Sequence, residues 1–78
     1  MNGAVEKEIG QNIRALREKA HLTQNEVAGK LQLLGCDITR SALAKIEVGQ
    51  RHLYPDEIIL LCEIFRCDYS DILKQTNK

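Results

Sequence analysis

Residues 22–51 read LTQNEVAGKLQLLGCDITRSALAKIEVGQR, and this stretch has the pattern of two helices joined by a turn. Thr23 and Glu26 have the spacing of a capping box, in which the Thr hydroxyl accepts a hydrogen bond from the third amide of the helix and the Glu carboxylate accepts one from the Thr amide. Thr39 is a second plausible N-cap. The stretch therefore predicts one helix that begins after Thr23 and another that begins after Thr39.

A glycine follows each of these two segments. Gly35 and Gly49 tolerate the left-handed backbone with which many helices end. The second helix is thus expected to run from Arg40 to Val48. The first is expected to bury its apolar side chains, Val27, Ala28, Leu31 and Leu34.

Apolar residues at helical spacing flank this unit on both sides. Upstream they predict a helix over residues 6–20. Downstream, Pro55 suits the first turn of a fourth helix, and Ser70 is the expected cap of a last turn that ends at Leu73. The class is therefore all-α, with five helices.

The chain has 78 residues, which is enough for one hydrophobic core only. We expect a single compact domain over residues 1–78, with its core over 6–73 and a loose tail over 74–78.

The segment from Arg40 to Val48 has two unlike sides when successive residues are placed about 100° apart. Leu43 and Ile46 share one side and are the expected core anchors. The other side is short, small and partly basic, so it suits the major groove of DNA. The residues expected to contact base edges are Arg40, Ser41, Ala44 and Lys45.

Residues 22–28 and 38–51 resemble the helix-turn-helix of the phage repressor and Cro-type (Xre) family, and the likeness extends over residues 6–73. The combination of Thr23-Gln24 at one end with Ile46-Glu47-Val48-Gly49 at the other is far more specific than either alone. The resemblance implies a lambda-repressor-like fold, a double-stranded DNA partner and a transcriptional regulator, most often a repressor. The stretch between Thr23 and Thr39 is longer than in the family's compact form, which leaves the tilt of the second helix open.

The resemblance also assigns roles outside the second helix. It implies that Arg17 and Glu47 form a partly buried ion pair. It further implies contacts with DNA phosphates, which position a protein without specifying sequence. The residues implied for those contacts are Gln24, Gln50, Arg51 and His52.

Composition excludes several other functions. No catalytic arrangement of Ser, His and carboxylates is visible, so we expect no enzyme activity, and no cofactor or small-molecule ligand is indicated. Cys36, Cys62 and Cys67 lack the spacing of a zinc site. No apolar run reaches the roughly 18 residues that span a membrane, and no signal-peptide pattern precedes the domain, so the expected location is the cytoplasm.

The distribution of charge leaves open an alternative to a DNA-binding regulator. The net charge is zero, with eight Lys/Arg against six Asp/Glu in residues 1–53 and three against five in 54–78. The neutral total and the acidic last third favour a protein-interaction module of the same fold, such as an antitoxin or an antirepressor partner. The DNA-binding part of a longer regulator is a third reading.

A DNA-binding domain of this size contacts only a few base pairs, so a homodimer is expected. The candidate surface for it is apolar and lies in the C-terminal part: Tyr54, Leu60, Ile64, Tyr69 and Leu73.

Overall fold

The computed structural model describes residues 3–75 and contains five helices with no strand among those residues. The predicted all-α fold is confirmed. The helices are α1 (Gly3–Lys19), α2 (Gln24–Leu33), α3 (Arg40–Glu47), α4 (Pro55–Phe65) and α5 (Tyr69–Leu73).

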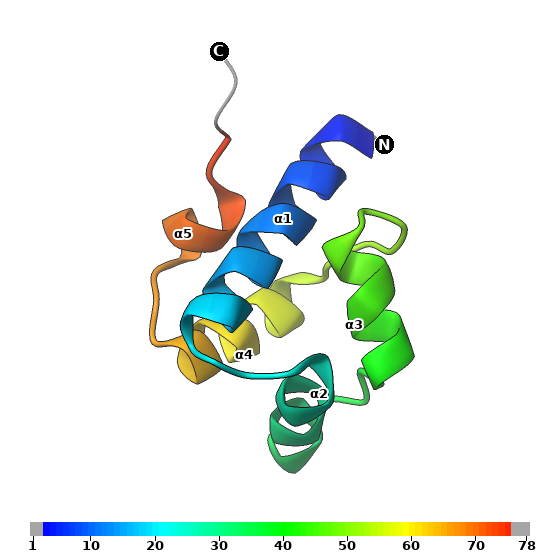
Figure 1. Ribbon diagram of the computed structural model, residues 1–78, viewed down its shortest axis with the longest axis vertical. Helices are drawn as coiled ribbons and strands as arrows, with labels where there is room; N and C mark the ends of the chain where they lie inside the picture. The colour runs from blue at the N-terminus through cyan, green and yellow to red at the C-terminus, as the bar shows by residue number, and fades with distance from the viewer. Residues whose placement is uncertain (1–2, 76–78) are drawn as a thin grey trace.

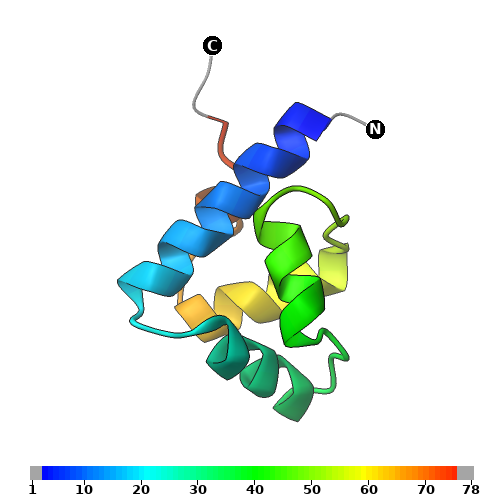
Figure 2. The same ribbon diagram turned by 45° about the vertical axis from the view of Figure 1, so that its right-hand side comes forward.

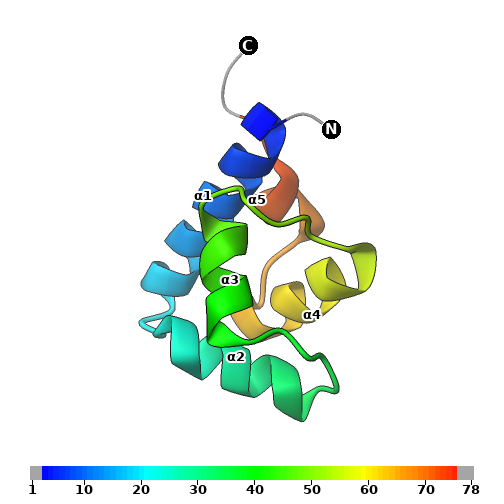
Figure 3. The same cartoon turned by 90° about the vertical axis from the view of Figure 1, so that its right-hand side faces the viewer.

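The longest helix, α1, crosses the molecule diagonally, with α5 on one side and α3 on the other (Figure 1). In Figure 2, α1, α2 and α3 lie in front and α4 lies behind them. A further turn brings α3 to the front, between α1 and α4 and above α2 (Figure 3). Helix α3 therefore rests on the rest of the domain along one side and faces outward along the other.

The core draws on all five helices, since the fully buried side chains are Ile13, Val27, Leu31, Leu43, Ile46, Leu61 and Ile72. Leu43 and Ile46 are the two that α3 contributes, as predicted. Burying a side chain of this size stabilises the fold by about 1.5–3 kcal/mol, so these two residues hold the inner side of α3 in place.

Two glycines bring the backbones of α1 and α3 close together. A Cβ atom on Gly10 would lie 2.3 Å from the carbonyl oxygen of Ile46 and 2.6 Å from that of Glu47. Just past α3, Gly49 has a φ of +81°, and a Cβ there would lie 2.8 Å from the Cα of Lys7. The C-terminal end of α3 is thus fixed against the first half of α1.

The predicted helix starts after Thr23 and Thr39 are confirmed. The Thr23 hydroxyl accepts from the Glu26 amide at 3.0 Å, and the Glu26 carboxylate accepts from the Thr23 amide at 2.8 Å. The Thr39 hydroxyl accepts from the Ala42 amide at 3.1 Å. These bonds satisfy amides that lack partners within a helix.

Several predictions about the helix ends are wrong. The helix predicted over residues 6–20 runs from Gly3 to Lys19, and the helix predicted to run from Arg40 to Val48 ends at Glu47. Leu34 is 45% exposed, because α2 ends at Leu33 and the chain turns away from the core through Gly35, whose φ is +86°. Ser70 lies inside α5 and does not cap it. Asp68 is the cap instead, because its amide donates to the Asp71 carboxylate at 2.9 Å and the helix starts earlier.

Asn12 joins the two ends of the fold. Its side-chain amide donates to the carbonyl oxygens of Ile72, at 2.8 Å, and Lys74, at 2.9 Å. Carbonyls at the end of a helix lack intrahelical partners, so this side chain of α1 caps α5. Lys74, the first residue of the predicted loose tail, is therefore bonded to α1, and residues 76–78 of that predicted tail lie outside the described part of the chain.

Candidate nucleic-acid interface

The outward side of α3 carries the four residues predicted to contact base edges. Arg40, Ser41 and Lys45 are exposed, and Ala44 between them is half-buried. Val48, directly after the helix, extends the same side and is 54% exposed. The geometry brings two cations and two small side chains onto one strip of α3.

A shallow depression continues this strip toward the first turn of α2. It is lined from three elements, and its residues are Arg14, Arg17, Leu22, Thr23, Gln24, Asn25, Arg40, Ala44, Glu47 and Val48. The strip on α3 and the capped start of α2 thus form one continuous surface.

Arg14 is a member of this surface that the sequence analysis missed. Its guanidinium bonds Glu18 at 3.1 Å, and both side chains are more than half exposed. Its position one turn before Arg17 on the same helix is the signal that could have identified it.

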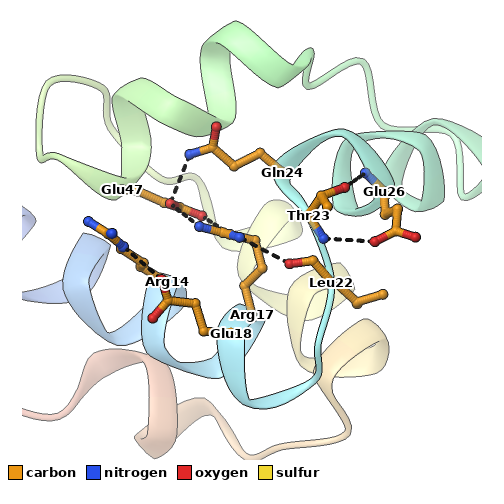
Figure 4. Close-up of polar contacts among 8 residues, drawn as sticks. All are labelled: Arg14, Arg17, Glu18, Leu22, Thr23, Gln24, Glu26 and Glu47. Carbon is orange, nitrogen blue, oxygen red and sulfur yellow. Dashed lines mark hydrogen bonds and ion pairs between the residues drawn. The ribbon is translucent and has the colours of Figure 1, made fainter.

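Beneath the depression, Arg17 and Glu47 form a bidentate ion pair (Figure 4). The Arg17 Nε donates to Glu47 Oε2 at 2.7 Å and its Nη2 donates to Oε1 at 3.1 Å. The Arg17 Nη1 donates to the carbonyl of Leu22 at 3.0 Å, and the Gln24 Nε2 donates to Glu47 Oε1 at 3.0 Å. One carboxylate on α3 therefore connects α1 with the start of α2.

The pair is nearly closed to solvent, with side chains 12% and 3% exposed for Arg17 and Glu47. Hydrogen bonding to Glu47 raises the pKa of Arg17, although burial opposes the charged form. A buried charge is tolerated only when it is paired and hydrogen-bonded, and the three donors on Glu47 meet that requirement. The network therefore sets the angle of α3 relative to α1 and α2.

The loop after α3 is built around a second ion pair. Arg51 donates from Nη1 and Nη2 to the Glu57 carboxylate at 3.0 and 3.2 Å, and its guanidinium lies 5.7 Å from the centre of the Tyr54 ring. Hydrogen bonding to Glu57 raises the pKa of Arg51. Glu57 is 7% exposed and also accepts from the Tyr54 amide at 3.0 Å.

The role of Glu57 as the partner of Arg51 was not predicted, although its place in the first turn of the helix after Pro55 matches capping spacing.

The other two loop residues predicted to contact phosphates differ in their surroundings. Gln50 is exposed. The His52 Nδ1 contacts the carboxylate of Glu6, on α1. Arg51 and His52 are thus bonded within the domain, whereas Gln50 faces solvent.

Residues 3–75 contain no group of three or more His, Cys, Asp or Glu that could hold a metal ion, and none of their helices has the length and apolar character of a membrane span.

The sequence profile of a family described as helix-turn-helix matches residues 13–72, which takes in the second part of α1, all of α2 to α4 and most of α5. The chain belongs to the helix-turn-helix family. The predicted resemblance is confirmed, and the helix-turn-helix is the unit formed by α2, the turn before Thr39, and α3.

Two known proteins resemble this helix-turn-helix chain. The crystal structure of the DNA-binding domain of BldD superposes with a TM-score of 0.79 over 94% of this chain and 99% of that domain, at 20% sequence identity. Antitoxin PezA of Streptococcus pneumoniae serotype 4 is 35% identical over 65 residues, or 83% of this chain. That match spans 38% of the antitoxin's length.

Proposed function

We propose that this protein binds double-stranded DNA sequence-specifically and regulates transcription, as a repressor, with α3 in the major groove. The observation that carries the proposal is the exposed strip of α3, whose inner side is held by Leu43, Ile46 and the buried Arg17–Glu47 pair. A helix must be rigidly presented to contact base edges. This function would place the protein in the cytoplasm.

Within the strip, each side chain has a distinct part. Arg40 and Lys45 donate to guanine acceptors, and Ser41 donates or accepts. Ala44 is small enough to let the helix approach closely, and its methyl group suits contact with a thymine methyl.

Gln24 is the best-placed phosphate ligand. A primary amide carries two hydrogens, and the bond to Glu47 uses one of them. The second hydrogen, together with the first-turn amides of α2, suits an anion at the start of that helix. A phosphate would thus meet a side chain that is already oriented by the buried carboxylate.

The remaining phosphate ligands lie in the loop after α3. Gln50 is free to turn toward DNA because its side chain is exposed. Arg51 would have to share its guanidinium with Glu57, and His52 would have to share its ring with Glu6. We therefore assign these two a weaker contribution than Gln24 and Gln50.

We further propose that two copies bind together, through the apolar surface of α4 and α5. Tyr54, Tyr69 and Leu73 are 52%, 55% and 40% exposed. Pro55, Ile58, Ile59, Tyr69 and Leu73 line one apolar depression. Leu60 and Ile64 are half-buried and lie outside it, so we restrict the proposed surface to this depression and Tyr54.

A selection from random genomic fragments at two salt concentrations tests the proposal. A regulator enriches one motif and loses affinity steeply as salt rises, because phosphate contacts release counterions. A homodimer enriches a palindrome. Fragments retained without a shared motif, or with affinity insensitive to salt, would refute sequence-specific binding.

The similarity to Antitoxin PezA supports a second candidate function, that of an antitoxin whose partner is a protein toxin. Co-expression with a toxin of that kind separates the two. Relief of growth arrest by the chain supports the antitoxin role, and enrichment of a DNA motif supports the regulator.

A further inference from the structure

The end of α4 brings two thiols together. Arg66 adopts the left-handed conformation, with a φ of 55°, and the chain reverses so that the Cys67 amide donates to the Cys62 carbonyl at 3.1 Å. This is the pattern of a Schellman motif, which places the residue after the left-handed position against the last helical turn. The two cysteine side chains lie in hydrogen-bonding contact as a result.

Both thiols line a surface depression between α4 and α5. The other residues of its wall are Ile59, Glu63, Asp68, Tyr69 and Ser70. Cys62 is 8% exposed and Cys67 is half-buried. A small ion can therefore reach the two sulfur atoms from solvent without opening the core.

The charges around the two thiols favour a cation. The carboxylate side chains of Glu63 and Asp68 line the same depression as the two thiols. Negative charge beside the sulfur atoms would stabilise a positive ion bound to them.

We propose that Cys62 and Cys67 form a two-sulfur binding site for a soft monovalent cation, Cu(I). On binding, each thiol releases one proton and each sulfur forms one bond to the metal, which stays in the +1 state. Soft thiolate ligands favour Cu(I), zinc and iron–sulfur clusters, and of these only Cu(I) is a monovalent cation. A structural zinc site needs four ligands, and no group of three or more His, Cys, Asp or Glu in residues 3–75 could supply them.

Binding would connect the last turn of α4 to the residue before the cap of α5. The site lies at the end of α4 and the start of α5, away from the α3 strip, so it does not depend on the proposed DNA binding, although its depression shares Ile59 and Tyr69 with the proposed dimer surface. Its expected effect is a higher melting temperature for the loaded protein, because a ligand bound only to the folded state stabilises that state.

The test is an anaerobic titration of the whole chain with Cu(I) against the chelator bicinchoninate. The wild-type protein should withdraw one equivalent of Cu(I) from the chelator and melt at a higher temperature. Cys67→Ser should lower the affinity at least about 100-fold, since even outer-shell changes cost 10–100-fold. Cys36→Ser, which changes the free cysteine in the turn before α3, is the matched control and should bind as the wild type does.

Three results would overturn the site: no withdrawal of Cu(I) by the wild type, unchanged affinity in Cys67→Ser, or an equal loss in Cys36→Ser. Cys62→Ser serves as a second variant, and the far-ultraviolet circular dichroism of each variant confirms that it is folded. Cys67 is the primary target because its half-buried side chain is replaced with less disturbance to the core.

Discussion

Arg17 and Glu47 lie thirty positions apart in the chain and meet in a two-bond ion pair, at 2.7 and 3.1 Å, that joins α1 to α3. One turn earlier on α1, Arg14 bonds Glu18 at 3.1 Å in a pair that is more than half exposed. Both are Arg–Glu ion pairs, but the Arg17–Glu47 pair is buried and the Arg14–Glu18 pair is exposed. Substitutions in the exposed pair are therefore the matched control for substitutions in the buried pair.

We expect Arg17→Met or Glu47→Leu alone to lower the free energy of unfolding by about 3–5 kcal/mol, because each strands a buried charge. The double variant should lose clearly less than the sum of the two, since it leaves no unpaired buried charge. Urea denaturation measures all three. The corresponding changes at Arg14 and Glu18 should each cost no more than about 0.5 kcal/mol and should add. Additive losses at Arg17 and Glu47 would show that the two residues act separately.

The close crossing at Gly10 gives a second prediction. Gly10→Ala places a methyl group against the backbone carbonyls of Ile46 and Glu47, so it should cost about 1–3 kcal/mol through overpacking. Gly29→Ala is the control, because it adds a methyl group on the exposed side of α2 with nothing within 4 Å. That change should raise the stability by about 0.5–1 kcal/mol. Thermal denaturation decides the signs, and a Gly10→Ala protein as stable as the wild type would contradict the crossing.

The α3 strip predicts a change of sequence preference. Lys45→Ala or Arg40→Ala should weaken binding to the selected motif by about 1–3 kcal/mol and relax the preference at the base that each residue contacts. Repeating the fragment selection with each variant measures this. Lys30→Ala removes the same charge from the exposed far end of α2 and should leave the preference unchanged.

Gln24→Ala should weaken all DNA sites alike, since a phosphate contact carries no base information. Its melting temperature must be measured as well, because Gln24 also bonds Glu47. Uniform losses in Lys45→Ala, Arg40→Ala and Gln24→Ala alike would place the base-contacting surface elsewhere.

Asn12→Ala tests the bonds between α1 and the end of α5. Losing both hydrogen bonds to the carbonyls of Ile72 and Lys74 should lower the free energy of unfolding by about 1–3 kcal/mol. Gln11→Ala, at the exposed neighbouring position, should change it by less than about 0.5 kcal/mol. Guanidinium denaturation compares the two, and similar values for both would remove Asn12 from the set of residues that hold α5.

The sequence predicted those parts of the fold that depend on neighbouring residues. The capping box of Thr23 and Glu26 spans one turn, and the left-handed conformation of Gly35 and Gly49 is a local property of each glycine. Residue type and spacing therefore suffice to predict both features. The buried side of α3 follows from helical periodicity alone.

Contacts between residues far apart in the chain could not be predicted from the sequence. Asn12 looks like a surface residue in the sequence, because its partners are backbone carbonyls sixty or more positions away. The closeness of Gly10 to α3 likewise depends on how two helices cross. The Arg17–Glu47 pair was anticipated only through the family resemblance.

The loop after α3 was the least predictable part of the candidate site. Arg51 was assigned to DNA phosphate because the family resemblance implies that role. The fold places the buried Glu57 within reach of it. Nothing in the spacing of the two residues distinguishes a partner in the protein from one in DNA.

The bond from Asn12 to the end of α5 also has a consequence for how the chain folds. Helices α2 and α3 are neighbours in sequence and can pair early, whereas Asn12 can reach the Lys74 carbonyl only after 62 positions of chain have been brought together. We therefore expect α5 to dock last, on the native side of the folding transition state. Loss of the Asn12 amide should then speed unfolding and leave the folding rate nearly unchanged.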